Sequence, residues 1–218
     1  MSARYTIVIG TKNWSSWSLR PYLALRATGA PFEEIVLRLR RPDTSAQIRQ
    51  YSSAGKVPVL KIVEHGHTAT VWESLAICET LAERHKDAGL WPDDAEQRAR
   101  ARSISSEMHS GFPALRAKLP MDFVRKHPTP ELDEETSTQI ARIVAAWTKQ
   151  LSRNPGDGYL FGRFSIADCM YAPVVSRFLT YGIELPPALR AYCARMMALP
   201  AMQDWARAAQ AEVDAGLA

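Results

Sequence analysis

The segment VPVLKIVEHGHTATVWES (residues 57–74) contains two apolar runs that are separated by a turn. Residues 59–63 and 68–72 are rich in β-branched side chains, and Gly66 lies between them. Such runs on either side of a glycine predict a β-hairpin. Pro58 has no N–H to donate, which suits the first position of a strand. We therefore expect an antiparallel strand pair here, with a helix beginning near Ser74.

Strands and helices alternate around this hairpin. Residues 5–10 and 33–40 resemble strands, and residues 18–29 and 74–85 show helical spacing of apolar side chains. Residues 44–52 are interpreted as a short, irregular helical piece. The predicted order over residues 1–86 is β-α-β-α-β-β-α, which gives a small mixed sheet of an α/β domain. Residues 87–94 contain the Pro- and Asp-bearing stretch GLWPDD and are predicted to be a linker.

Residues 95–218 are predicted to form an all-helical domain. Residues 95–119 read as one long helix that Pro113 bends, and residues 132–152 carry an apolar stripe at helical spacing. Three further helices follow within residues 164–179, 185–199 and 200–213. Ser165 and Asp168 have the spacing of a capping box at the first of these three.

The composition excludes several classes of protein. Of 218 residues, 46% are hydrophobic and 23% charged, and the net charge of +4 is too small to indicate nucleic-acid binding. No apolar run approaches the ~20 residues of a membrane helix, and no signal-peptide pattern opens the chain. The three cysteines, Cys78, Cys169 and Cys193, have the spacing of neither a disulfide framework nor a zinc site. We therefore expect free thiols, no metal and a cytoplasmic protein.

Four short segments occur in order along the chain: SSWSLRPYLAL (15–25), GKVPVL (55–60), ESLAI (73–77) and FSIADCMYAP (164–173). Together they resemble the cytosolic glutathione transferase family across essentially the whole chain. The resemblance implies the glutathione transferase fold, in which a thioredoxin-like N-terminal domain is joined to a helical-bundle C-terminal domain. It also implies a homodimer and glutathione as co-substrate.

The resemblance implies a glutathione site around residues 56–58 and 73–74. The Val57–Pro58 bond would be cis, so that the backbone of Val57 pairs with the cysteinyl part of glutathione. Ser74 would bind the γ-glutamyl carboxylate at a helix N-terminus, where anions are favoured, and Glu73 would neutralise the ammonium. Lys56 would face a glutathione carboxylate. On local grounds alone, Glu73 and Ser74 are equally well explained as a helix cap, and Lys56 as a solvated lysine.

The serines near residue 15 are the candidate catalytic groups. The pKa of a cysteine thiol is ~8.5, so a hydroxyl that donates to the sulfur at a helix N-terminus would favour the thiolate. The segment resembles serine-type, zeta-like transferases, and on that register Ser15 is the thiolate-stabilising residue and Ser16 the second choice. Trp17 stands where zeta enzymes have a cysteine, which puts isomerase activity in doubt. Ser18 is assigned to capping or packing.

For the electrophile, the resemblance points to the first helix of the C-terminal domain. Met108, His109 and Phe112 are candidate pocket residues together with Trp17, although a helical stripe of this kind also suits a core. The leading hypothesis is a transferase that conjugates glutathione to small hydrophobic electrophiles. The alternatives are a glutathione-dependent isomerase or peroxidase, or a non-catalytic binding or regulatory protein of the same fold.

Overall fold

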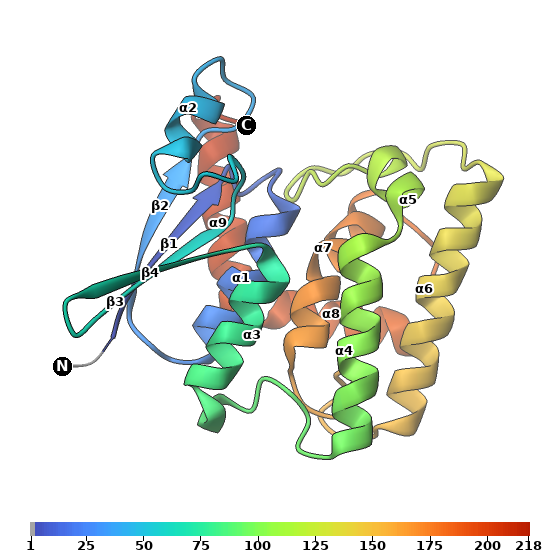
Figure 1. The fold of residues 1–218 in the computed structure, drawn as a ribbon. Coiled ribbons are helices and arrows are strands. Elements are labelled where there is room, and N and C mark those ends of the chain that lie inside the picture. The colour runs from blue at the N-terminus through green and yellow to red at the C-terminus, as the bar shows by residue number, and fades with distance from the viewer. Residues whose placement is uncertain (1–2) are drawn as a thin grey trace.

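The N-terminal half of the chain is built on a four-stranded mixed sheet. The computed structural model describes residues 3–218 and orders the strands β2-β1-β3-β4 (Figure 1). β1 pairs parallel with β2 and antiparallel with β3, and β3 pairs antiparallel with β4, so that the predicted hairpin is confirmed. The strands are β1 (Arg4–Gly10), β2 (Phe32–Leu37), β3 (Val59–Glu64) and β4 (His67–Trp72).

The alternation of side chains along each strand gives the sheet two buried faces. Ile7 and Leu60 belong to the main core with α1 (Ser16–Ala27) and α3 (Ser74–Arg84). Val8 follows Ile7 and Val59 precedes Leu60, so both side chains lie on the opposite face of the sheet. There they form a smaller cluster with Ile48 of α2 (Thr44–Arg49). Helices therefore cover both faces, and the predicted thioredoxin-like arrangement is confirmed.

The second half is helical. Helix α7 (Ile166–Thr180) is buried along most of its length and packs against α1 and α4 (Ala95–Ser110), while α9 (Pro200–Asp214) returns to contact α1 (Figure 1). The last helix of the chain thus packs on a helix of the first half. The division into two domains at residues 87–94 stays a prediction. The elements are η1 (Lys86–Ala88), α4 (Ala95–Ser110), α5 (Pro113–Lys118), α6 (Glu134–Arg153), α7 (Ile166–Thr180), α8 (Pro187–Ala198) and α9 (Pro200–Asp214).

The long helix expected over residues 95–119 is two helices. Gly111 is extended, with φ −97° and ψ −174°, and Phe112 has a left-handed backbone with φ 62°. Pro113 then occupies the first position of α5, where its missing N–H costs nothing. A residue before proline is disfavoured in the helical region, so the chain breaks here rather than bends. The second strand also ends earlier than expected, at Leu37.

Two local expectations about side chains, the capping box and the free cysteines, are confirmed. Ser165 and Asp168 form the capping box of α7, and Cys78, Cys169 and Cys193 are free and buried. Burial raises the pKa of the Cys78 thiol to about 12. Within residues 3–218, no helix has the length and apolar character needed to span a membrane. The same residues contain no cluster of three His, Cys, Asp or Glu side chains fit to hold a metal ion.

Candidate functional site

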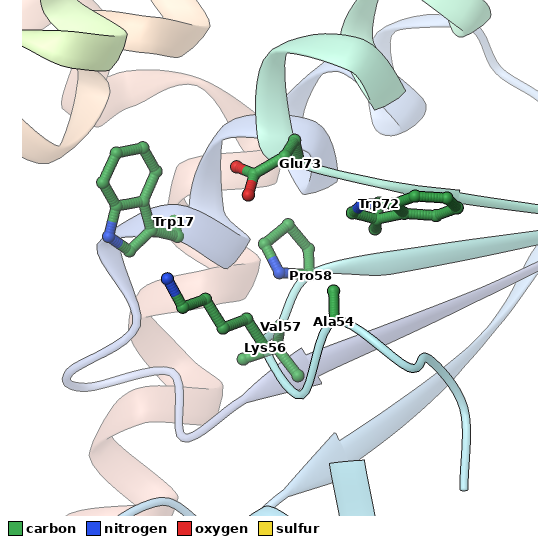
Figure 2. A pocket seen from close by; sticks show the side chains of 7 residues that line it. All are labelled: Trp17, Ala54, Lys56, Val57, Pro58, Trp72 and Glu73. Atoms are coloured by element: carbon green, nitrogen blue, oxygen red, sulfur yellow. The ribbon is translucent and has the colours of Figure 1, made fainter. Parts of the chain in front are cut away.

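A pocket of about 320 Å³ opens where β3 begins and α1 and α3 start. Figure 2 shows Trp17 and Trp72 at its two ends, with Pro58 between them. The carboxylate of Glu73 lies on one side of Pro58, and the ammonium of Lys56 reaches towards Trp17 on the other. The pocket thus brings together predicted site residues from three segments. Its lining is Trp17, Ala54, Lys56, Val57, Pro58, Trp72 and Glu73.

The backbone at the floor of the pocket can still form hydrogen bonds. The Val57–Pro58 peptide bond is cis, as the resemblance implied. Among residues 3–218, no hydrogen bond engages the N–H or the C=O of Val57. Backbone polar groups are normally paired, with protein or with another molecule. Val57 therefore offers one donor and one acceptor to an extended peptide-like ligand.

The N-terminus of α3 also has an unused polar group beside the pocket. Ser74 is the first residue of the helix and is fully buried, and its Oγ has no hydrogen-bond partner among residues 3–218. Glu73, just before it, has the positive φ of 67° that is uncommon for a residue other than glycine. A helix N-terminus favours anions, and a buried hydroxyl without a partner is destabilising. Both facts suit a carboxylate bound at this end of α3.

The candidate catalytic serines lie at the start of α1. Ser15 is the residue before the helix and Ser16 is its first residue; they are 5% and 6% exposed. The Oγ of Ser15 donates to the Oγ of Ser18 at 2.7 Å, and the N–H of Gly10 also donates to the Ser18 oxygen at 3.1 Å. The pocket lining includes Trp17 but neither of these serines. Trp17 thus brings the start of α1 to the pocket, and a contact of Ser15 or Ser16 with a ligand there stays a prediction.

The loop that carries Ser15 is held by the helical domain. The Glu212 carboxylate of α9 accepts hydrogen bonds from the N–H groups of Lys12, at 2.9 Å, and Asn13, at 3.0 Å. Trp205 donates to the Lys12 carbonyl at 3.0 Å, and the Asn13 side chain donates to Asp122 at 2.8 Å. These partners are about 110 to 200 residues away in sequence, so no local pattern could have predicted them.

Trp17 is surrounded by cationic and aromatic side chains. The guanidinium groups of Arg20 and Arg116 lie 4.3 and 4.7 Å from the centre of its ring, within the range of cation–π contacts. His109 meets the same ring edge to face at 5.3 Å, and its Nε2 is 3.7 Å from Oε2 of Glu73. Burial, together with the charges of Arg20 and Arg116, lowers the pKa of His109. His109 therefore joins α4 to the pocket chiefly as a neutral ring at pH 7.

Three arginines behind Trp17 have no acidic partner within the described chain. Arg20 is fully buried; its Nε donates to the Met170 carbonyl, while both terminal nitrogens lack partners. Arg116 and Arg177 donate only to backbone carbonyls. Burial and mutual repulsion lower the pKa of Arg20, and that of Arg177 to about 10. An unpaired buried charge is costly, so this cluster would favour an anion nearby. No local pattern in the sequence predicts this cluster, because its members come from three separate helices.

The other candidate residues for the electrophile pocket lie in the protein core. Met108 and Phe112 are 1% and 7% exposed and belong to the main hydrophobic core, and neither is part of the pocket lining. His109, by contrast, contacts two residues of the pocket lining, Trp17 and Glu73. A role for Met108 or Phe112 with an electrophile stays a prediction.

Two curated proteins are similar to this chain over most of its length. The chain is 27% identical over 172 residues to the probable maleylacetoacetate isomerase of Caenorhabditis elegans, covering 79% of this chain and 78% of that protein. It is 28% identical to glutathione S-transferase omega-1 of Rattus norvegicus over 191 residues, which are 83% and 72% of the two chains.

A solved structure and two family models extend the match to most of the chain. The maleylacetoacetate isomerase of Anaeromyxobacter dehalogenans, solved with dicarboxyethyl glutathione and citrate in its active site, superposes with a TM-score of 0.68. It is 27% identical, and 94% of each chain is covered. Residues 14–84 match the N-terminal domain of glutathione S-transferases and residues 134–195 match the C-terminal domain, so the chain belongs to the glutathione S-transferase family.

Proposed function

We propose that this protein binds glutathione in the pocket above Pro58, favours its thiolate through the Ser15 hydroxyl and transfers it to a small electrophile. The observation that carries the proposal is Ser74, whose buried hydroxyl at a helix N-terminus beside the pocket has no partner among residues 3–218. Ser74 would bind the γ-glutamyl carboxylate and Glu73 the ammonium of the same group. Lys56 would face the other end of the tripeptide.

The backbone of Val57 supports the same placement. Its free N–H and C=O suit antiparallel pairing with the cysteinyl residue of the tripeptide, which would leave the sulfur near the start of α1. There the helix dipole and a donated hydrogen bond both favour the anion. In the reaction the sulfur lone pair forms a bond to the electrophilic carbon. A leaving group departs with its electrons, or a polarised double bond accepts them and is then protonated.

Ser74→Ala is expected to weaken glutathione binding about tenfold, because a hydrogen bond to a charged carboxylate is lost. Stability should hardly change, since the hydroxyl has no partner within the described part of the chain. Isothermal titration with glutathione measures the binding. Ser105→Ala is the matched control, because Ser105 lies on α4 and is also fully buried, with an Oγ that has no partner among residues 3–218. Equal affinities for wild type and Ser74→Ala would contradict the assignment.

A second candidate function is a glutathione-dependent isomerase that acts on an anionic substrate. Arg20, Arg116 and Arg177 form a positive cluster without an acidic partner among residues 3–218, which favours a substrate that carries carboxylates. Several of the relatives are named as maleylacetoacetate isomerases. Addition of the thiolate to a double bond, rotation and elimination would isomerise the bond without consuming glutathione. One feature argues against isomerase activity: Trp17 occupies the position at which zeta enzymes have a cysteine.

Arg20→Met separates these two functions. We expect the variant to keep or gain stability, because a buried and unpaired charge is replaced by an apolar side chain. Conjugation of chlorodinitrobenzene, a neutral acceptor, should change less than threefold, whereas isomerisation of maleylacetoacetate should fall about tenfold through loss of the positive field. Parallel assays of both reactions provide the comparison. Equal decreases in the rates of conjugation and isomerisation would contradict the proposal of an anionic substrate.

We further propose that the protein is a cytoplasmic homodimer with a role in detoxification. The edge strand β4 presents Trp72, which is 49% exposed beside the pocket, and a second copy would cover this edge. The three buried free thiols suit a reducing compartment.

A further inference from the structure

The hydroxyl of Ser18 links strand β1 to the candidate catalytic serine. Its oxygen accepts a hydrogen bond from the N–H of Gly10, the last residue of β1, at 3.1 Å. The same oxygen is 2.7 Å from the Oγ of Ser15, which donates to it. Ser18 is fully buried, so water does not compete for either bond. Ser18, a buried side chain of α1, is thus hydrogen-bonded directly to Ser15.

The direction of the Ser15–Ser18 bond must change when Ser15 acts on a sulfur anion. A hydroxyl has one hydrogen, so Ser15 cannot donate to a thiolate and to Ser18 at the same time. Once Ser15 turns its hydrogen to the sulfur, its oxygen becomes free to accept. The Ser18 hydrogen has no other hydrogen-bond acceptor among residues 3–218, and an unpaired buried donor is costly. Ser18 would then donate to Ser15.

We propose that Ser18 is a positioning residue that completes a one-way chain of hydrogen bonds, from the Gly10 N–H through Ser18 and Ser15 to the glutathione sulfur. The inference rests on the proposed function and adds a residue to it. A hydroxyl that accepts one hydrogen bond becomes a better donor in the next, so Ser18 strengthens the bond from Ser15. The bond from Gly10 fixes the position of Ser18, and Ser18 in turn fixes the rotamer of Ser15.

The charged groups around the pocket do not provide the same effect. Lys56 and Glu73 line it, and Arg20, Arg116 and His109 surround Trp17. All of them remain unchanged when a serine is replaced, so a difference between serine variants reports on the hydroxyl chain. A structural role for Ser18 would change stability or glutathione affinity without depending on Ser15.

A double-mutant cycle of Ser15→Ala and Ser18→Ala tests the proposal, with the ionisation of bound glutathione followed by thiolate absorbance against pH. Ser18→Ala alone should raise the pKa of the bound thiol by about 0.5 unit and lower kcat about threefold, with little change in KM for glutathione. In the Ser15→Ala background, Ser18→Ala should have no further effect on that pKa. Ser176→Ala is the control and should match wild type, because Ser176 is a buried serine of α7 whose Oγ has no partner in the described part of the chain.

The outcomes distinguish this inference from the proposed function. If Ser15→Ala raises the pKa and Ser18→Ala leaves it unchanged, or if the two effects add, the chain through Ser18 is wrong while the role of Ser15 stands. If the wild-type thiol ionises as it does in free glutathione, the proposed function itself fails. Ser18→Cys is the second variant, for use if Ser18→Ala folds poorly. It nearly preserves the side-chain size but forms weaker hydrogen bonds, so it should also raise the pKa of the bound thiol.

Discussion

Replacing Ser15 with alanine is expected to raise the pKa of the bound glutathione thiol by about one to two units and to lower kcat/KM for conjugation about 10- to 100-fold. A hydrogen bond to a charged group contributes about 1.5–3 kcal/mol, and each pKa unit corresponds to about 1.4 kcal/mol. The tripeptide itself should still bind, because Val57, Glu73 and Ser74 remain in place. Some ionisation should also remain, since the N-terminus of α1 still favours the anion.

Ser16→Ala provides the matched comparison for this prediction. Ser16 is the neighbouring hydroxyl, with nearly the same exposure, and is the first residue of α1. Titration of thiolate absorbance in wild type and both variants gives the three pKa values, and steady-state conjugation gives the rates. We expect wild-type behaviour from Ser16→Ala. The reverse result, with Ser15→Ala unchanged and Ser16→Ala impaired, would move the catalytic role to Ser16.

The sequence predicted those features that local chemistry decides. The hairpin of β3 and β4 followed from two β-branched runs around Gly66, and the capping box of α7 from the spacing of Ser165 and Asp168. The cis bond at Pro58 required the family resemblance, because proline on its own is far more often trans. Lys56, Val57, Pro58 and Glu73 line one pocket, where the family resemblance had grouped them, and their role in binding glutathione stays a prediction.

Features that depend on contacts between distant segments were not predictable. Glu212 binds the loop before Ser15 across about 200 residues, and nothing in the sequence around it indicates that contact. Arg20 and Arg116 resemble ordinary basic residues of amphipathic helices until the packing of α1 against the helical domain buries them around Trp17. The break at Gly111 was missed because the helical spacing on both sides of it is continuous.

Asp168→Ala is expected to lower the free energy of unfolding by about 3 kcal/mol or more at pH 7, the largest loss of stability predicted here. The buried carboxylate accepts four hydrogen bonds: from the Leu160 N–H, the Tyr192 hydroxyl, and the N–H and hydroxyl of Ser165. Its removal leaves several buried donors without partners, and each costs about 1–3 kcal/mol. Urea unfolding measures the loss, and Ser165→Ala should cost only about 1 kcal/mol.

The pH dependence of this effect has a definite sign. Burial raises the pKa of Asp168 from 3.8 to about 6 in the folded protein, although its four donors act in the opposite direction. The folded state therefore binds a proton more tightly than the unfolded state does. The contribution of Asp168 to the free energy of unfolding is therefore greatest below pH 3.8 and declines as the pH rises to about 6. Wild type and Asp168→Ala should then differ more in unfolding free energy at pH 4.5 than at pH 7. A smaller difference at pH 4.5 would mean that the four donors outweigh burial and hold the carboxylate ionised, with its pKa below 3.8.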